Sequence, residues 1–149
     1  MFYYSYNSTI LGRIYIAEDK GFITNISFKE LKAKKEETPL IKKTYQELEE
    51  FLNKKRKTFD IPIKANGTNF QKRVWEELLK IPYGQTVTYK EIAQRIGNPK
   101  AFRAVGMANN KNPIVIIIPC HRVIGINNNL TGYSGGVEIK QKLLELERF

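Results

Sequence analysis

The pattern of the chain changes at the short polar connector Lys64-Ala65-Asn66-Gly67. Before it the sequence is rich in Tyr, Ile and Phe, residues that favour strands. After it, short apolar stripes follow helix-capping residues. We therefore expect an α+β protein, with a small antiparallel-sheet domain over residues 1–64 and a mostly helical domain over residues 65–149.

Two strand-like segments lie in the first part, at residues 13–17 and 22–28. The turn sequence Asp19-Lys20-Gly21 separates them, so they are expected to pair as antiparallel strands. Residues 31–38 are charged and predict a loop. A further strand is expected over residues 58–63.

A helix is predicted after the charged segment, because Thr38 can act as its N-cap and Pro39 suits its first position. Apolar residues spaced three or four apart give this helix one buried face: Ile41, Tyr45, Leu48 and Leu52. No residue pattern in the first part points to chemistry. We expect this part to be a scaffold.

Two capping boxes mark the starts of helices in the second part. Thr68 and Gln71 form the first box, and Thr88 and Glu91 form the second. The second helix is short and stops at Gly97. The first helix carries an apolar stripe: Phe70, Val74, Leu78 and Ile81.

A third helix is predicted to begin with Asn98 as its cap and Pro99 at its first position, and to run to about Asn109. With the short helix before it, it forms a helix-turn-helix candidate. Its small residues permit close approach, either to another helix or to a DNA groove. Arg103 stands out among these small neighbours, which favours contact with DNA shape or the minor groove over base reading in the major groove.

Charge supports a nucleic-acid partner for this region. The 149 residues include 25 Lys and Arg against 15 Asp and Glu, a formal net charge of +10. Between Tyr89 and Val123 six basic residues accompany one acidic residue, so half of the net charge lies in under a quarter of the chain. This excess favours a polyanionic partner and argues against an acidic-tail or chaperone-like role. The six basic residues are Lys90, Arg95, Lys100, Arg103, Lys111 and Arg122.

Membrane and export signals are missing from the sequence. No apolar run approaches the roughly 20 residues that a membrane helix needs, and no basic segment followed by an apolar one opens the chain. We expect a soluble, cytoplasmic protein, associated with the nucleoid if its source is prokaryotic, with no membrane partner.

The one cysteine and the one histidine of the chain are neighbours, Cys120 and His121. A single cysteine excludes an intramolecular disulfide, and the pair cannot supply a His/Cys metal cluster. They follow residues 114–118, a continuous apolar run between prolines that predicts a strand buried on both faces.

A lone cysteine is more often a buried structural residue than a nucleophile. Here the imidazole of His121 and the guanidinium of Arg122 are adjacent to Cys120, and both can stabilise a thiolate, the reactive form. Neighbours on a strand point to opposite faces. Coupling between Cys120 and His121 therefore needs a turn or a bridging water.

The segment around this pair resembles the O6-alkylguanine-DNA alkyltransferases. The match runs from about residue 70 to residue 147, and its five-residue core is highly specific. The first part fits the variable N-terminal domain of that family only by size and strand content. The motifs that carry the resemblance are Arg103-Ala104-Val105-Gly106, Asn112-Pro113, Pro119-Cys120-His121-Arg122-Val123 and Gly132-Tyr133-Ser134-Gly135-Gly136.

The resemblance implies a small RNase H-like domain followed by a winged helix-turn-helix-like domain. It implies direct-reversal DNA repair by a monomer that binds double-stranded DNA containing O6-alkylguanine, with O4-alkylthymine as a second candidate substrate, and that needs no cofactor. Vertebrate members hold zinc in the N-terminal domain. No Cys or His precedes Cys120 here, so we expect no metal.

The resemblance also implies a role for each matching residue. Cys120 matches the acceptor that takes the alkyl group irreversibly. His121 matches the residue that deprotonates the acceptor through a water molecule, and Glu147 the carboxylate that orients this histidine. Asn112 matches the asparagine that organises the active-site turn, and Tyr89 the tyrosine at the phosphate and base of the flipped nucleotide.

Further positions match residues that contact DNA or the alkyl group. Arg103 matches the arginine that fills the stack after base flipping, and Lys90 and Asn98 match DNA-contacting positions. Val123, Tyr133 and Ser134 match the walls of the alkyl pocket. Soft sulfur suits attack on a saturated carbon, and extruding the base from the duplex costs a few kcal/mol.

Two other functions are weighed against transfer. A non-enzymatic binder of alkylated DNA, as in alkyltransferase-like proteins, replaces the acceptor cysteine, and Cys120 argues against it. A Cys-His hydrolase or redox thiol protein needs a separated triad or a resolving cysteine, and the sequence has neither.

Overall fold

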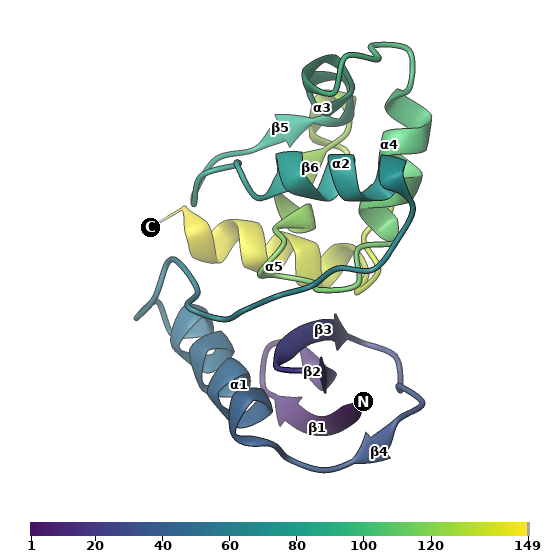
Figure 1. Cartoon of the computed structure of the whole chain (residues 1–149). Helices are drawn as coiled ribbons and strands as arrows, with labels where there is room; N and C mark the ends of the chain where they lie inside the picture. Colours follow the sequence, from purple (N-terminus) through teal and green to yellow (C-terminus); the bar gives the residue numbers. More distant parts are fainter. Residues whose placement is uncertain (149) are drawn as a thin grey trace. The chain divides into compact units, whose positions relative to one another are not determined.

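The computed structural model describes residues 1–148 (Figure 1). The chain divides into two compact units. The first unit consists of Met1–Asn66 and Pro113–Val115, and the second of Gly67–Asn112 and the chain from Ile116 onward. The three residues that return to the first unit lie only a few positions before Cys120.

A four-stranded sheet forms the first unit, with strand order β3-β2-β1-β4. The antiparallel pairing predicted from the turn sequence is confirmed. Lys20 and Gly21 both have positive φ, 50° and 85°, as a tight two-residue hairpin requires. The strands are β1 (Phe2–Ser8), β2 (Gly12–Asp19), β3 (Phe22–Ser27) and β4 (Lys34–Lys35).

Two predictions for this unit were wrong. The charged segment is not all loop, because β4 pairs in parallel with β1 at Phe2 and Tyr3. Residues 58–63 form no strand; only Ile63 makes an isolated bridge, to Ile23. Pro62 has no N–H to donate, and the backbone N–H of Asp60 donates to Glu47 Oε1 at 2.8 Å rather than to a strand, so the pairing at Ile63 does not extend into a ladder.

Helix α1 (Pro39–Leu52) contacts β1 and β2. The predicted cap is present, since the Thr38 hydroxyl accepts the N–H of Ile41 at 3.1 Å. Leu48 on the predicted face is fully buried, whereas Tyr45 is only half-buried and stacks on Tyr6 with 3.9 Å between ring centroids. The first unit thus buries one helix face against its sheet.

Helices dominate the second unit (Figure 1). Both predicted capping boxes are present, each with its two reciprocal hydrogen bonds. Helix α4 packs against α2 and α3, and the indole N–H of Trp75 donates to the carbonyl of Ala108 at 2.9 Å. The elements are α2 (Asn69–Leu78), β5 (Val87–Thr88), α3 (Tyr89–Arg95), α4 (Phe102–Asn110), η1 (Cys120–Arg122), β6 (Val123–Ile124), η2 (Ile126–Asn128) and α5 (Val137–Glu147).

The start of the third predicted helix was placed too early. Helix α4 begins at Phe102, and Asn98 is not its cap. Instead the carbonyl of Asn98 accepts the N–H of Ala101 at 3.0 Å, which closes a turn before the helix. Pro99 and Lys100 lie in this turn, so the connection between α3 and α4 is longer than the sequence suggests.

The buried strand predicted at residues 114–118 is absent. The residues are buried apart from half-buried Ile117, but Ile114 makes only an isolated bridge to Ile26 and a turn follows. Ile116 has φ 74°, a left-handed conformation that is costly for a β-branched residue. The apolar run therefore bends, and the chain enters the segment of Cys120 from a turn rather than from a strand.

Candidate active site

Cys120 begins the short 3₁₀ turn η1, directly after Pro119. Its side chain is 2 % exposed, and its N–H donates to the carbonyl of Ile118 at 2.8 Å. A turn, rather than a strand, thus connects Cys120 to His121. A turn is one of the two arrangements expected to couple Cys120 to His121, the other being a bridging water molecule.

His121 and Glu147 form a buried pair between η1 and α5. His121 Nε2 lies 2.5 Å from Glu147 Oε2, and the two residues are 0 % and 5 % exposed. Burial lowers the pKa of His121 and outweighs the carboxylate beside it, so the imidazole is neutral near pH 7. With its hydrogen on Nε2 toward the carboxylate, the imidazole keeps a lone pair on Nδ1, which has no hydrogen-bond partner in the described protein.

Glu147 is also bound by Arg122. Arg122 Nε donates to Oε1 at 2.8 Å and Nη2 donates to Oε2 at 3.1 Å, while Nη1 donates to the carbonyl of Ile81 at 2.8 Å. The N–H of Gly84 donates to Oε1 at 3.0 Å. Burial would raise the pKa of Glu147, but the hydrogen bonds from His121 and Arg122 lower it to about 2.

The guanidinium of Arg122 therefore holds Glu147, and the interpretation that it stabilises the thiolate directly was wrong. Burial raises the pKa of Cys120 to about 11, opposed by a hydrogen bond from Asn112 and by the charge of Lys140. At neutral pH the resting side chain is a thiol. Nucleophilic chemistry at Cys120 thus needs a base.

Lys140 is a buried cation that the sequence interpretation missed. It is 0 % exposed, its Nζ donates to the carbonyl of Val123 at 2.6 Å, and burial lowers its pKa to about 8. Its spacing to Leu143 and Glu147 places all three on one face of α5. That spacing, a lysine on an otherwise buried helix face, was the signal available in the sequence.

Asn112 braces the turn before Cys120. Its Nδ2 donates to the carbonyl of Ile118 at 2.8 Å, and its side chain hydrogen-bonds Cys120. A second amide, Asn109 in α4, donates from Nδ2 to the carbonyl of Cys120 at 3.3 Å. The sequence interpretation included the first asparagine and missed the second.

Two tyrosines lie near the acceptor. Tyr89 opens α3 and is half-buried, and Tyr133 is 6 % exposed in the loop before α5. Burial and the charge of Cys120 raise the pKa of both phenols. Lys140 Nζ lies 5.9 Å from the ring centroid of Tyr89. Val123 is buried directly after η1, whereas Ser134 is exposed.

The remaining predicted residues lie on the surface of the second unit rather than in this buried cluster. Arg103 is exposed in the first turn of α4, and Asn98 is exposed in the turn between α3 and α4. Lys90 is exposed on α3, and its Nζ lies 5.6 Å from the ring centroid of Phe102. These side chains place positive and polar groups around the helix-turn-helix.

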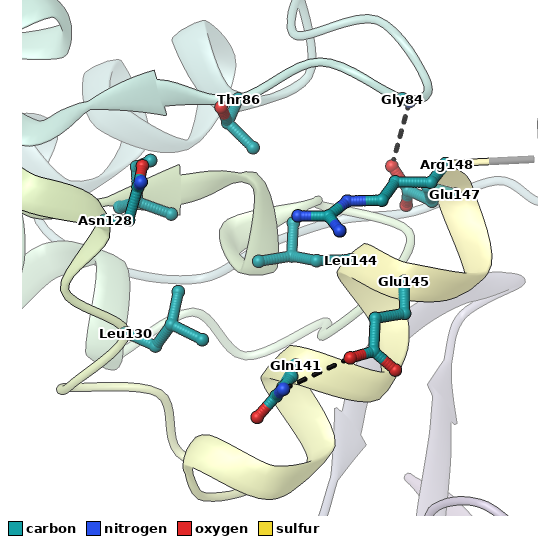
Figure 2. Close-up of a pocket in the computed structure, with 10 residues that line it drawn as sticks. Gly84, Thr86, Asn128, Leu130, Gln141, Leu144, Glu145, Glu147 and Arg148 are labelled. Carbon is teal, nitrogen blue, oxygen red and sulfur yellow. Dashed lines mark hydrogen bonds between the residues drawn. The ribbon is translucent and has the colours of Figure 1, made fainter.

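A cavity of about 450 Å³ borders Glu147 (Figure 2). It is lined by residues of α5, among them Gln141, whose Nε2 donates to Glu145 at 3.1 Å. Its lining includes Glu147 and Gly84 but neither Cys120 nor Tyr89. Within residues 1–148, no group of three or more His, Cys, Asp or Glu side chains is arranged to hold a metal, and no helix is long and apolar enough to cross a membrane.

Comparison with known proteins matches both parts of the chain to one family. Residues 1–65 match the ribonuclease-like domain of 6-O-methylguanine DNA methyltransferase, and residues 69–149 match its DNA binding domain. The chain is 46 % identical over 153 residues to a methylated-DNA–protein-cysteine methyltransferase of Methanosarcina mazei, covering 99 % of this chain and 97 % of the relative. It is 45 % identical over 159 residues to the constitutive enzyme of that name in Bacillus subtilis, covering 99 % and 96 %.

A solved structure agrees with these matches. The crystal structure of Mycobacterium tuberculosis OGT in complex with DNA has a TM-score of 0.90 and 42 % identity, covering 99 % of this chain and 93 % of the other. The similarity to this structure covers both units. This chain has the α+β order of a small sheet domain followed by a helical one. The chain belongs to the 6-O-methylguanine DNA methyltransferase family.

Proposed function

We propose that this chain repairs double-stranded DNA by transferring the alkyl group of O6-alkylguanine to Sγ of Cys120, once per molecule. The observation that carries the proposal is a buried cysteine followed in one 3₁₀ turn by a histidine whose Nε2 lies 2.5 Å from a buried carboxylate. The names of its relatives, methylated-DNA–protein-cysteine methyltransferases, support the same reaction.

Deprotonation of Cys120 is the first step. The thiol proton passes through a water molecule to Nδ1 of His121, which is neutral because burial lowers its pKa. Glu147 accepts the hydrogen on Nε2 and stabilises the imidazolium that forms. Lys140 stabilises the thiolate by its charge.

Attack of the thiolate completes the transfer. A bond forms between Sγ and the alkyl carbon as the bond from that carbon to guanine O6 breaks, and the electron pair leaves on guanine. The hydroxyl of Tyr89 donates a hydrogen bond to the leaving base, and a proton returned from the imidazolium by way of solvent makes guanine neutral. The product is an S-alkyl thioether of Cys120, and because thiols do not cleave the bond between its sulfur and the saturated alkyl carbon, the molecule acts once.

The exposed side chains of the helix-turn-helix bring DNA to this site. Lys90 and Asn98 contact the backbone, and Arg103 occupies the space left in the stack when the alkylated base is extruded. Tyr133 and Val123 wall the alkyl pocket, with Ser134 at its edge. All of these residues lie in the second unit, and we propose that residues 1–64 serve as its scaffold.

Intact mass spectrometry tests this function. After incubation with a duplex containing one O6-methylguanine, the protein is expected to gain the mass of one methyl group, and the duplex to regain guanine. The matched control is the same duplex with guanine, and the control variant Cys120→Ala is expected to bind the methylated duplex without gaining mass. A wild-type protein that binds the methylated duplex and stays unmodified contradicts transfer and supports a non-enzymatic binder.

A further inference from the structure

Phe102 is a large apolar side chain on the surface of α4, the helix that carries Arg103. It is the first residue of the helix and is 37 % exposed. A single exposed apolar residue is common on protein surfaces and needs no function by itself. Phe102 differs from such residues in its surroundings.

The residues around Phe102 on α4 are small. Ala101 precedes it, Ala104 is exposed in the same turn, and Gly106 follows one turn later. A helix surface of this kind lets another molecule approach its backbone closely, and the phenyl ring of Phe102 extends beyond it. DNA that comes within reach of the small residues therefore also meets this ring, as it meets the side chain of Arg103.

Phe102 also lies beside the residues proposed to act on the flipped nucleotide. Residues four apart in a helix share a face, so Phe102 and Gly106 lie on one side of α4. A Cβ at Gly106 would lie 3.9 Å from the ring of Tyr89, so this side is turned toward the start of α3. The Nζ of Lys90, the next residue of α3, lies 5.6 Å from the ring centroid of Phe102. The ring thus has Tyr89 and Lys90 near it and Arg103 next to it in the chain.

The ammonium group of Lys90 favours this position of the ring. A cation within about 6 Å of an aromatic centroid is attracted by the negative face of the ring. This contact holds the side chain without burying it, since Phe102 remains exposed. The protein therefore presents a phenyl ring in a defined position beside the positive side chains that contact DNA.

The chemistry of a phenyl ring limits what it can contact in DNA. It has no hydrogen-bond donor or acceptor for phosphates or base edges, and its favourable contacts are with base faces and deoxyribose. Extrusion of one nucleotide exposes the faces of the bases next to it. Proteins that bind the minor groove often insert apolar wedges, phenylalanine among them, between bases.

We propose that Phe102 is a wedge that stacks on a base next to the extruded O6-alkylguanine, so that two side chains of α4 replace the lost stacking. Arg103 fills the gap, and Phe102 covers a base face that borders it. This inference rests on the proposed function, in which the alkylated base leaves the duplex. It makes Phe102 a determinant of reaction with duplex DNA relative to the free base.

Substitutions of Phe102 test this role on a duplex containing one O6-methylguanine. In the non-transferring Cys120→Ala protein, Phe102→Ala is expected to weaken binding about tenfold, within the range that one base–aromatic stack contributes. Phe102→Tyr keeps the ring and is expected to bind within about twofold of the parent protein. Phe102→Leu keeps apolar volume without the ring, and its affinity is expected to lie between those of the other two variants. Leucine that binds as tightly as phenylalanine overturns the inference.

Transfer kinetics give a second readout in protein that retains Cys120. The rate of transfer from duplex, relative to that from free O6-benzylguanine, is expected to fall about tenfold in Phe102→Ala. The matched control is Phe22→Ala, an exposed phenylalanine of β3, which is expected to leave both affinity and this ratio unchanged. Thermal unfolding of each variant verifies that it is folded at the assay temperature.

Two other roles for the ring give different results. If the ring obstructs DNA, Phe102→Ala binds the duplex at least as tightly as the parent protein. If the ring only positions Lys90 on a phosphate, Phe102→Ala lowers the slope of log affinity against log salt by about 0.9 in magnitude, whereas loss of a stack leaves the slope unchanged. Either of these results overturns the inference.

The decisive measurement removes the stacking partner. Two duplexes each carry abasic residues in place of one base pair next to O6-methylguanine, one on its 5′ side and the other on its 3′ side. In one of them the loss caused by Phe102→Ala is expected to fall below about twofold, because side chain and base act as a coupled pair. A tenfold loss that persists in both duplexes overturns the inference. Wild-type protein that transfers no alkyl group contradicts the proposed function itself, whereas active wild type with an unaffected Phe102→Ala variant contradicts only this inference.

Discussion

His121 Nε2 lies 2.5 Å from Glu147 Oε2, and the same carboxylate is clamped by Arg122 through two further hydrogen bonds. The base is therefore oriented by a group that is itself fixed. Burial keeps the imidazole neutral and the ion pair keeps the carboxylate charged. The acceptor thiol, whose own pKa is raised, obtains a base that is ready near neutral pH.

Glu147→Gln is expected to lower both activity and stability. It weakens the hold on His121, and it leaves Arg122 as a buried charge without its partner, which costs about 3 kcal/mol. Transfer is expected to slow about a hundredfold, the range in which an oriented general base contributes. Chemical denaturation and single-turnover kinetics measure the two effects.

The matched control for that change is Glu145→Gln, an exposed neighbour on α5. It is expected to alter neither the stability nor the rate of transfer appreciably.

In wild type the pKa of Glu147 is lowered from 4.5 to about 2, so its stabilising contribution is present above pH 4.5 and is lost as the pH falls through 2. Equal acid sensitivity of wild type and Glu147→Gln would rule out this contribution.

The pH dependence of transfer follows from His121. The base must be neutral, and burial lowers its pKa below the ordinary 6.5. The rate is therefore expected to hold as the pH falls through 6.5 and to decline only at lower pH. Rates of transfer from free O6-benzylguanine, measured from pH 5 to 8, give this pH profile. A decline centred at or above 6.5 would show that a different group, or an unperturbed histidine, limits the reaction.

Lys140→Met is expected to raise the stability of the protein and to slow transfer. A buried ammonium costs desolvation that a methionine of similar length does not, so the variant is expected to be more stable by about 1–3 kcal/mol at pH 7. It also loses the charge that stabilises the Cys120 thiolate, so transfer is expected to slow. Lys142→Met, exposed on the same helix, is the control.

The stability difference between wild type and Lys140→Met is expected to decrease as the pH rises. The pKa of Lys140 is lowered from 10.5 to about 8, so between these values the unfolded chain binds more protons than the folded one. The stability of wild type then rises with pH in that window, and the advantage of Lys140→Met shrinks from pH 8 to 10.5. An advantage that is constant over this window would mean that the buried ammonium is not its source.

Arg103→Ala is expected to slow the repair of duplex DNA but not the reaction with the free base. If this side chain occupies the gap left by the extruded nucleotide, its loss slows repair of duplex about tenfold or more, within the few kcal/mol that extrusion costs. Reaction with free O6-benzylguanine is expected to be unchanged. Arg13→Ala, an exposed arginine of β2, serves as the control. Equal losses on both substrates would remove Arg103 from base extrusion.

Local signals in the sequence predicted local structure well. The two capping boxes at Thr68 and Thr88 and the hairpin at Lys20-Gly21 are all present, because each depends on residues three or four apart. The path of residues 114–118 was not predictable in this way. Apolar composition indicates burial, but it cannot distinguish a strand from a bent segment with a left-handed Ile116.

The site itself was predicted only in part, for a related reason. The motif around Cys120 pointed to the acceptor and its histidine, yet the guanidinium of Arg122 binds a carboxylate 25 residues away instead of the adjacent thiol. Lys140 and Asn109 belong to helices whose buried faces depend on how they pack against the acceptor turn. Such contacts between distant residues are set by tertiary structure and leave little trace in local spacing.

Titration with an excess of methylated duplex tests the central claim most directly. The claim is that Cys120 is a single-use acceptor. Methyl transfer is predicted to stop at one group per protein molecule, and peptide mapping is predicted to locate that group on Cys120. Continued release of repaired DNA beyond one equivalent, or a methyl group on any other residue, would contradict it.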